Sequence, residues 1–123
     1  MENQEIIPLE NHLCFVKSLS KNDKKIYWAV YSFDEFIGSV NIEFIDNSSV
    51  ERGIYVNPEY LGQSKGTLIE LALDKLLIQF HINRVEAKVL LTNERSLKFH
   101  QKTGYQLTSV DNKYYYLEKH LDT

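Results

Sequence analysis

Two stretches of the chain contain residue types whose spacing could support chemistry. The first is the loop LGQSKGT, from Leu61 to Thr67, which runs directly into a segment of strong helix formers. Gly62 and Gly66 lack a Cβ atom, so the backbone of this loop can approach a ligand closely. Its main-chain N–H groups and the first turn of the following helix offer donors and a positive dipole end to an anion. With the added charge of Lys65, this loop could hold a pyrophosphate.

Other interpretations of this loop compete with anion binding. An ordinary strand-to-helix connection also favours Gly and Ser. The nucleotide-binding pattern GxxxxGK[ST] is not matched, because the order here is Lys65, Gly66, Thr67, and GxGxxG is also absent. The loop taken alone therefore leaves a plain connection and an anion-binding loop open.

The second stretch is NERSLKFHQKTGY, from Asn93 to Tyr105. Asn93 and His100 are seven residues apart, nearly two helical turns, so they share a helix face with Ser96 between them. Taken singly, Asn93 is explained as a helix N-cap, and His100 as a surface or half-buried ring. Their joint occurrence after the glycine loop favours a site built from both stretches.

Hydrophobic periodicity predicts the elements that position these residues. One apolar stripe (Leu9, Leu13, Val16 and Leu19) predicts a helix that begins at Pro8 and ends near Ser20. Three strands joined by short turns follow as an antiparallel meander, over residues 26–33, 36–45 and 50–56. The remaining elements are a helix over 67–80, a strand over 85–91, a helix over 94–102 and a hairpin of 105–110 with 113–119.

This order, α-β-β-β-α-β-α-β-β, predicts an α/β (α+β) fold with a mixed sheet and one locally parallel strand pair. The length of 123 residues and the 43% hydrophobic content indicate a single domain that covers residues 1–123. The net charge of −3 does not favour a nucleic-acid partner. No apolar run approaches the ~20 residues of a membrane span, so no membrane association is expected.

The cysteine and histidine residues bear on the cellular compartment and on metal binding. Cys14 is the single cysteine, which excludes an intrachain disulfide and indicates a reducing compartment. The N-terminus lacks the basic and apolar regions of a signal peptide, so we expect a cytoplasmic protein. His12, His81 and His120 are scattered, and no metal-ligand spacing is present, so no metal is expected.

Taken together, the two stretches resemble motifs of the GNAT superfamily of acetyl-CoA-dependent N-acetyltransferases. The family's acyl-CoA loop reads [QR]-x-x-G-x-[GA] after Pro-Glu-Tyr, and residues 58–66 read PEYLGQSKG, with Leu61 for Gln/Arg and Ser64 for Gly. The family's later motif reads N-x-x-[AS]-x-x-x-Y-x-x-x-G-[FY]. It is matched in register by Asn93, Ser96, Gly104 and Tyr105, with His100 in place of the usual tyrosine.

Diffuse similarity over most of the chain also resembles the nucleotide-sugar N-acetyltransferases of the pseudaminic acid pathway, which act in flagellin modification. The resemblance implies that acetyl-CoA is the cosubstrate and that the acetyl group moves to a primary amine of a small acceptor, with a UDP-amino-sugar as one candidate. A peptide or protein N-terminus is a rival acceptor.

The resemblance also implies roles for individual residues. Glu51 would be the general base, although an outward-facing strand carboxylate paired with a lysine is an equal alternative. His100 would give a proton or a hydrogen bond to the leaving thiol. Lys65, Lys98 and Lys102 could meet phosphates. The residues expected to bind the cofactor are Ile54, Tyr55, Val56, Leu61, Gly62, Gln63, Ser64, Lys65, Gly66, Thr67, Asn93 and Ser96.

GNAT domains usually open with a strand and two helices, whereas one expected helix precedes Ile26 here. The resemblance therefore implies a GNAT acyl-CoA N-acyltransferase fold that lacks the usual first strand and helix. Two hypotheses follow. A second copy of the chain could pair with the strand at Tyr27–Phe33 in a homodimer. Alternatively, the acceptor site is impaired and the chain is a non-catalytic acyl-CoA-binding or scaffold module.

Overall fold

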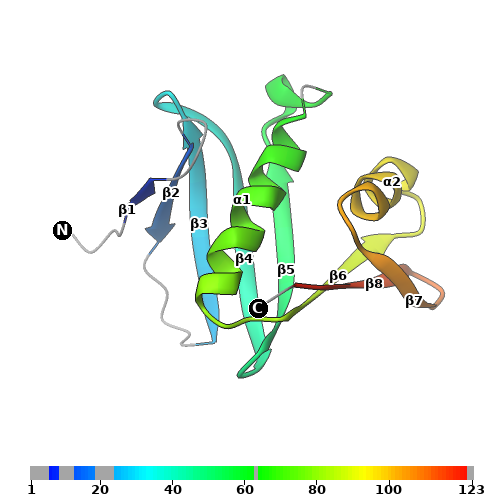
Figure 1. Cartoon of the computed structure of the whole chain (residues 1–123). Coiled ribbons are helices and arrows are strands. Elements are labelled where there is room, and N and C mark those ends of the chain that lie inside the picture. The colour runs from blue at the N-terminus through cyan, green and yellow to red at the C-terminus, as the bar shows by residue number, and fades with distance from the viewer. Residues whose placement is uncertain (1–5, 9–12, 19–23, 63, 122–123) are drawn as a thin grey trace.

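The computed structural model describes residues 6–8, 13–18, 24–62 and 64–121. Over these residues the chain forms an eight-stranded sheet in the order β1-β2-β3-β4-β5-β6-β8-β7 and two α-helices (Figure 1). The elements are β1 (Ile6–Pro8), β2 (Leu13–Ser18), β3 (Lys25–Ser32), β4 (Glu35–Asp46), β5 (Ser49–Val56), a 3-10 turn (Pro58–Tyr60), α1 (Lys65–Gln79), β6 (Arg84–Leu90), α2 (Glu94–Lys102), β7 (Gln106–Val110) and β8 (Tyr114–His120). The mixed α+β class expected from the sequence is confirmed.

The helix expected from Pro8 to Ser20 is wrong. The described parts of this range are the antiparallel strands β1 and β2, in which Ile7 lies opposite Phe15. Along β2, Leu13 and Phe15 are buried while Cys14 is only half-buried, which is the two-residue period of a strand. Pairing with neighbouring strands therefore outweighed the helical spacing, and residues 9–12 and 19–20 lie outside the described residues.

The hypothesis of an unpaired strand at Tyr27–Phe33 is also wrong. The whole of β2 pairs with β3, from Leu13 opposite Ser32 to Ser18 opposite Tyr27. On its other side β3 pairs with β4. This strand is therefore internal to the sheet, and the reason for expecting a second copy at its edge is removed.

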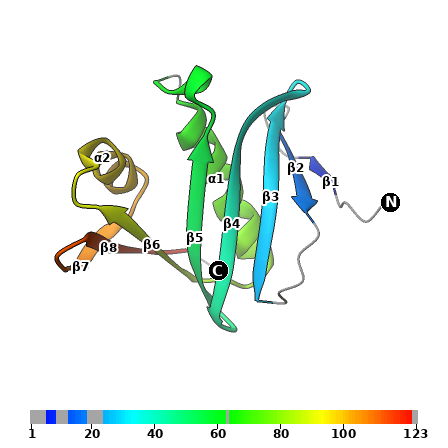
Figure 2. The same ribbon diagram turned by 180° about the vertical axis from the view of Figure 1, so that it is seen from behind.

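The antiparallel meander β3-β4-β5 is confirmed, and α1 covers one of its faces (Figure 1). The buried side of the sheet carries residues that alternate along each strand, among them Trp28 and Val30 of β3. The helix contributes buried apolar residues to the same core: Ile69, Ala72, Leu73, Leu76 and Leu77. Figure 2 shows the opposite face of β3-β5, which neither α1 nor α2 covers. Antiparallel sheets commonly leave one face to solvent in this way.

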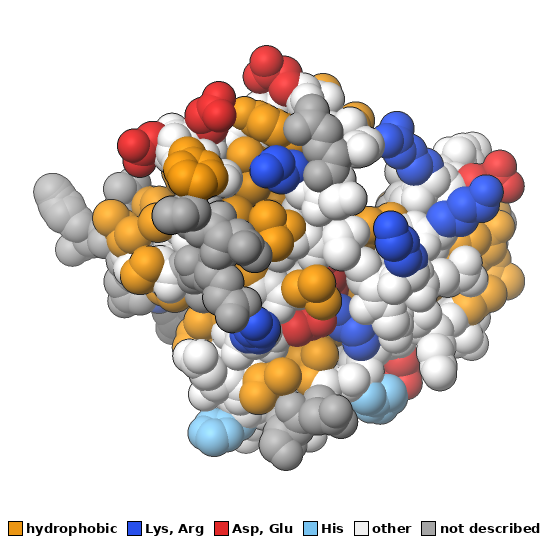
Figure 3. All heavy atoms as spheres, turned by 45° about the horizontal axis from the view of Figure 1, so that its top comes forward, with side chains coloured by type: hydrophobic (Ala, Val, Ile, Leu, Met, Phe, Trp, Pro, Cys, Tyr) orange, Lys and Arg blue, Asp and Glu red, His pale blue; other side chains and the backbone are white. Residues whose placement is uncertain are grey.

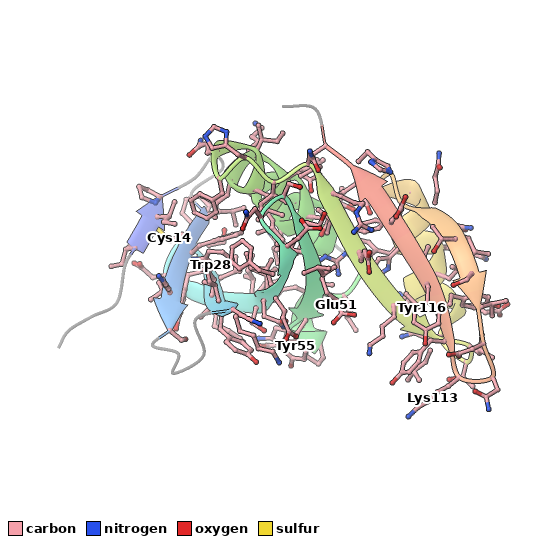
Figure 4. The ribbon with its side chains drawn as sticks, turned by 90° about the horizontal axis from the view of Figure 1, so that it is seen from below. Cys14, Trp28, Glu51, Tyr55, Lys113 and Tyr116 are labelled. Carbon is pink, nitrogen blue, oxygen red and sulfur yellow. The ribbon has the colours of Figure 1, made fainter. Side chains whose placement is uncertain are left out.

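The parallel pair expected from the sequence is confirmed as β5 and β6, which α1 connects. The ladder is short: it joins Ser49–Glu51 to Arg84–Glu86 in three residue pairs. Beyond these pairs, β5 continues to Val56 beside β4, and β6 continues to Leu90 beside β8. Figures 1 and 4 show the two strands close together at one end and apart at the other. The β6-facing edge of β5 after Glu51 therefore has no strand partner in the described sheet.

The C-terminal elements match their expected ranges closely. The side chain of Asn93 accepts a hydrogen bond from Ser96 N at 3.0 Å and caps α2, which covers residues 94–102 as expected. Gly104, at φ 106°, takes the chain out of the helix. The hairpin β7-β8 turns at Asp111, whose carboxylate accepts from Lys113 N at 2.8 Å and Tyr114 N at 2.7 Å.

Gly38 of β4 lies opposite Val56, the last residue of β5. A Cβ atom at this position would lie 2.2 Å from the carbonyl oxygen of Tyr55, which belongs to the backbone and cannot rotate away. We expect Gly38→Ala to displace β5 and to lower the free energy of unfolding by about 2–3 kcal/mol. Urea unfolding would measure this loss. Gly53→Ala is a matched control, because its Cβ would meet only the side-chain amide of Asn41; equal losses in both variants would contradict the argument.

Candidate active site

A groove of about 580 Å³ lies between the N-terminus of α1 and α2, with the end of β5 as its floor. Its volume falls in the range typical of small-molecule sites. The groove is lined by Ile54, Val56, Tyr60, Leu61, Gly62, Ser64, Lys65, Gly66, Thr67, Asn93, Arg95, Ser96, Lys98, Phe99 and Lys102. Two stretches that are far apart in sequence therefore meet at one surface.

This groove is lined by most of the residues that were expected from the sequence to bind the cofactor. There are two differences. Tyr55 does not line it: the strand alternation turns its half-exposed side chain away from the groove, whereas Ile54 and Val56 face it. Gln63 lies outside the described residues.

The N-terminus of α1 is built to leave backbone donors available. Ser64 precedes the helix in the left-handed conformation, with φ 62° and ψ 15°, and its side chain makes no capping hydrogen bond. The first turn also contains no acidic residue. The first N–H groups of a helix have no partner within the helix, and they carry the positive end of its dipole. This end of α1 can therefore donate hydrogen bonds to an anion in the groove.

Gly66 allows α1 and α2 to approach each other at this point. A Cβ atom here would lie 3.2 Å from the Phe99 ring and 3.3 Å from the Val56 side chain. A larger residue would push α1 away from α2 and β5, and thereby widen the groove. The second glycine of the loop thus has a packing role in addition to the backbone access expected from the sequence.

Four cations line the groove, and sequence reasoning missed one of them. Lys65, Lys98 and Lys102 were expected near phosphates, and Arg95 joins them from the first turn of α2. Figure 3, in which the top of Figure 1 comes forward, shows several Lys and Arg side chains on this face of the molecule. A cation in the first turn of a helix is unfavourable towards the helix dipole, and that was the signal available in the sequence. An anionic ligand would offset this cost.

His100 was expected to serve the leaving thiol, and the structure places it away from the groove. The side chain is 3% exposed and packs edge-on against Phe99 and Tyr105. Its Nδ1 lies 2.7 Å from the carbonyl oxygen of Ser96, which can only accept, so Nδ1 carries the proton. The buried Nε2 then carries a lone pair without a hydrogen-bond partner in the described part of the chain.

Burial and the positive charge of Arg52 lower the pKa of His100 to about 4. The ring is therefore neutral at pH 7 and has no free N–H to give to a thiolate. Proton donation would first require protonation of the buried ring. The role of His100 as a proton donor stays a prediction, and the reaction proposed below does not use it.

The lowered pKa of His100 predicts how stability depends on pH. The unfolded chain binds this proton below about pH 6.5, whereas the folded chain resists it down to about pH 4. The contribution of His100 to stability is therefore complete above pH 6.5 and falls by up to about 3 kcal/mol as the pH drops to 4. We expect His100→Gln to flatten the measured dependence over this interval relative to wild type. A slope in His100→Gln identical to that of wild type would refute the assignment.

A second cavity, of about 220 Å³, lies over β6, β8 and β7 and reaches β5 at Glu51, the last residue of β5 that pairs with β6. It is lined by Glu51, Glu86, Ala87, Thr108, Ser109, Tyr116, Leu117 and Glu118. Glu51 alternates with the buried Val50 and Arg52, so its side chain projects from the face opposite α1. Figure 4 shows Glu51 and Tyr55 projecting from β5, with Tyr116 on β8 beyond β6. The groove and this cavity therefore approach the diverging strands from opposite faces of the sheet.

Glu51 has no ion-pair partner among the described residues, so the alternative of a lysine-paired surface carboxylate is not what the structure shows. Across the sheet, Glu43 of β4 lies opposite it on one side, and Glu86 on β6 and then Glu118 on β8 lie on the other. Arg84 binds Glu86 and Glu118, and Lys25 pairs with Glu43. Glu51 is thus the carboxylate of this row that remains available at the cavity.

The described residues contain no group of three or more His, Cys, Asp or Glu side chains placed to hold a metal ion. Among the described residues, no helix has the length and apolar character of a membrane span.

A family model identifies the family to which the chain belongs. The model of the acetyltransferase (GNAT) family matches residues 2–105, and the chain belongs to this family. It is an acetyltransferase by class, as the two sequence motifs indicated.

Two curated relatives and several solved structures are similar to the chain. The acetyltransferase PseH of Campylobacter jejuni strain 81-176 is 27% identical over 114 residues, which covers 90% of this chain and 70% of the relative. The crystal structure of C. jejuni PseH in complex with acetyl coenzyme A superposes with a TM-score of 0.73 at 22% identity, covering 83% of this chain and 72% of that one.

A GNAT family acetyltransferase from Elizabethkingia anophelis with acetyl-CoA bound gives a TM-score of 0.78 at 11% identity, covering 91% of this chain and all of that one. The solved structures thus agree with the fold.

Proposed function

We propose that the chain moves an acetyl group from acetyl-CoA to the primary amine of a small acceptor, with both substrates bound at once. The observation that carries this proposal is the pair of cavities on opposite faces of the sheet, which approach the point where β5 and β6 part. The thioester would enter from the groove and the amine from the cavity at Glu51. The unpartnered edge of β5 then lies between the two reactants.

The groove supplies the contacts that acetyl-CoA needs. Its diphosphate is an anion that would accept from the free N–H groups at the start of α1, where Ser64 and Lys65 lie. The cations of α2, Arg95 among them, would meet the remaining phosphate charge. The pantetheine arm is an extended amide chain, and the unpaired backbone edge after Glu51 would bind it as a strand does. Asn93 already caps α2, so its side-chain N–H groups remain for the ligand.

The reaction requires removal of a proton from the attacking amine. Glu51 would accept this proton, directly or through one water molecule. The amine nitrogen attacks the thioester carbon, and the resulting oxyanion would accept a hydrogen bond from a main-chain N–H of the β5 edge near Ile54. The C–S bond then breaks. The thiolate takes a proton from solvent, which is favourable at neutral pH because a thiol titrates near ~8.5.

Two observations bear on the acceptor. The resemblance of the sequence to nucleotide-sugar N-acetyltransferases favours an amino-sugar nucleotide as the acceptor, and both curated relatives are acetyltransferases named PseH. The cavity at Glu51 is small and rich in hydroxyl and carboxylate groups, which suits an amine that carries hydroxyl groups. The single cysteine favours a reducing, cytoplasmic setting for this reaction.

The experiment that tests this function has two stages. Calorimetry with coenzyme A should detect binding, and thiol release from acetyl-CoA should then depend on an added amine. The acceptor panel should contain a UDP-amino-sugar, a polyamine and a peptide with a free N-terminus. Binding of coenzyme A without turnover on any of these amines would favour the non-catalytic acyl-CoA-binding or scaffold module. Absence of coenzyme A binding would overturn both functions.

A further inference from the structure

The divergence of β5 and β6 divides the molecule into two parts that share little backbone pairing. The first part consists of β1 to β5 with α1, and the second consists of β6, β7, β8 and α2. The strand ladder between them contains three residue pairs at one end of β5. The separation of the two strands at the open end must therefore be fixed by side chains.

Four buried side chains bridge the two parts on the α1 side of the sheet. This buried cluster consists of Arg52 on β5, Glu70 on α1, Tyr105 after α2 and Lys119 on β8. Their side chains are almost inaccessible to solvent, with exposures of 1% for Glu70 and 6% for Lys119. Two members thus come from each part of the molecule.

The carboxylate of Glu70 joins the two parts directly. Lys119 Nζ donates to it at 2.6 Å and the Tyr105 hydroxyl donates to it at 2.8 Å, both from the second part. From the first part, Arg52 Nε lies 3.1 Å from the other carboxylate oxygen and donates to the Tyr105 hydroxyl at 3.1 Å. Tyr105, from the second part, therefore accepts from Arg52 and donates to Glu70, and so holds two side chains of the first part.

Electrostatics keeps Glu70 ionised in this position. Burial alone would raise the pKa of its carboxyl, but the adjacent charges of Arg52 and Lys119 hold that pKa below its ordinary value. Burial raises the pKa of the Tyr105 hydroxyl well above its usual value, so that hydroxyl stays protonated and remains a donor.

Stability alone is a weak reason for such a cluster. Well-packed apolar residues of similar volume often stabilise a protein as much as a buried ion pair does or more, because the charges lose their hydration. The position of the cluster is more informative. Arg52 immediately follows Glu51, the last residue of β5 that pairs with β6, and Ile54 two residues later lines the groove. The cluster therefore holds β5 between Glu51, at the second cavity, and Ile54, at the groove.

We propose that Glu70 and Tyr105 are positioning residues, which hold β5 and β6 at the separation that aligns the thioester in the groove with the amine at Glu51. This inference rests on the proposed function for its catalytic consequence. Neither side chain lines the groove or the second cavity, so both act through Arg52 and β5.

Tyr105→Phe is the sharpest test, because it keeps the ring and removes only the linking hydroxyl. With saturating acetyl-CoA and acceptor, we expect kcat to fall more than tenfold while the Kd for coenzyme A changes less than threefold. Glu70→Gln should act in the same direction and serves as a second variant if the first does not fold. Val30→Ala is the control, since Val30 is fully buried in the first part and lies outside the cluster.

A second readout needs no turnover and therefore separates this inference from the proposed function. Spin labels at two exposed positions, Glu35 at the start of β4 and Leu90 at the end of β6, in a Cys14→Ser background, would report the distance between the two parts at the open end. We expect Tyr105→Phe to shift or broaden this distance, and Val30→Ala to leave it unchanged. An unchanged distance in Tyr105→Phe, or an equal loss of kcat in both variants at equal loss of stability, would overturn the positioning role.

Discussion

Glu51→Gln is expected to lower kcat by about 10²- to 10⁴-fold while the Kd for coenzyme A stays within threefold of wild type. The magnitude is that of removing a general base from an enzyme that depends on one. Glutamine keeps the shape of the side chain but cannot accept the proton of the attacking amine. Glu51 lies in the second cavity, across the sheet from the groove, so binding of coenzyme A should be preserved. Steady-state kinetics and calorimetry would measure the two quantities separately.

The matched control for this variant is Glu43→Gln. Glu43 lies directly opposite Glu51 on the neighbouring strand β4, and it has an exposed ion pair with Lys25. It does not line the second cavity. We expect its kcat to match wild type, because it lies outside the space that the amine would occupy. A full rate in Glu51→Gln, or an equal loss in Glu43→Gln, would remove Glu51 from the mechanism.

Ser64→Asp is expected to weaken coenzyme A binding at least 100-fold without loss of stability. The new carboxylate would stand where the diphosphate is expected to lie, at the start of α1. Two like charges about 5 Å apart repel by roughly 3 kcal/mol at an effective dielectric of ~20, which corresponds to that factor. An acidic residue at a helix N-terminus is favourable towards the helix dipole, so the free energy of unfolding should stay constant or rise by less than about 1 kcal/mol.

Ser64→Asn is the control for this change, because Asn has nearly the same shape, lacks the charge and tolerates the left-handed conformation of this position. We expect it to bind coenzyme A within a few-fold of wild type. Calorimetry and thermal unfolding of all three proteins would separate binding from stability. If Ser64→Asp binds coenzyme A as tightly as Ser64→Asn does, the diphosphate does not lie at this helix end.

The second half of the fold was predictable from the sequence because its signals are local. The capping residue Asn93 and the terminating Gly104 fix both ends of α2, and the predicted range is the observed one. The N-terminal strands were not predictable in this way. Leu13 and Phe15 of β2 pair with β3 and are buried in the core, and no local signal reports that pairing.

In the candidate site, too, the features with local sequence signals were predictable and those set by tertiary packing were not. The groove residues were found because backbone donors, glycines and a capping asparagine leave short, ordered motifs in the sequence. The only sequence signal for Arg95 was its charge, which is unfavourable in the first turn of a helix. The cluster around Glu70 left a still weaker signal in the sequence. A charged residue within the apolar pattern of α1 does not indicate which distant residues will neutralise it. Such pairings are set by tertiary packing, over separations of 35 and 49 residues for Tyr105 and Lys119.

The short β5-β6 ladder also has a consequence for the order in which the chain assembles. The hairpins β3-β4 and β7-β8 join residues that are close in sequence, so closing them costs little loop entropy. The ladder joins Glu51 to Glu86, so it can form only after the intervening helical crossover has folded back onto the sheet. Contacts between residues that are far apart in sequence form slowly, because the chain between them must first be closed into a loop. The junction at which the two substrates would meet is therefore among the last features of the molecule to be completed, and a nascent chain has no competent site until its C-terminal strands have docked.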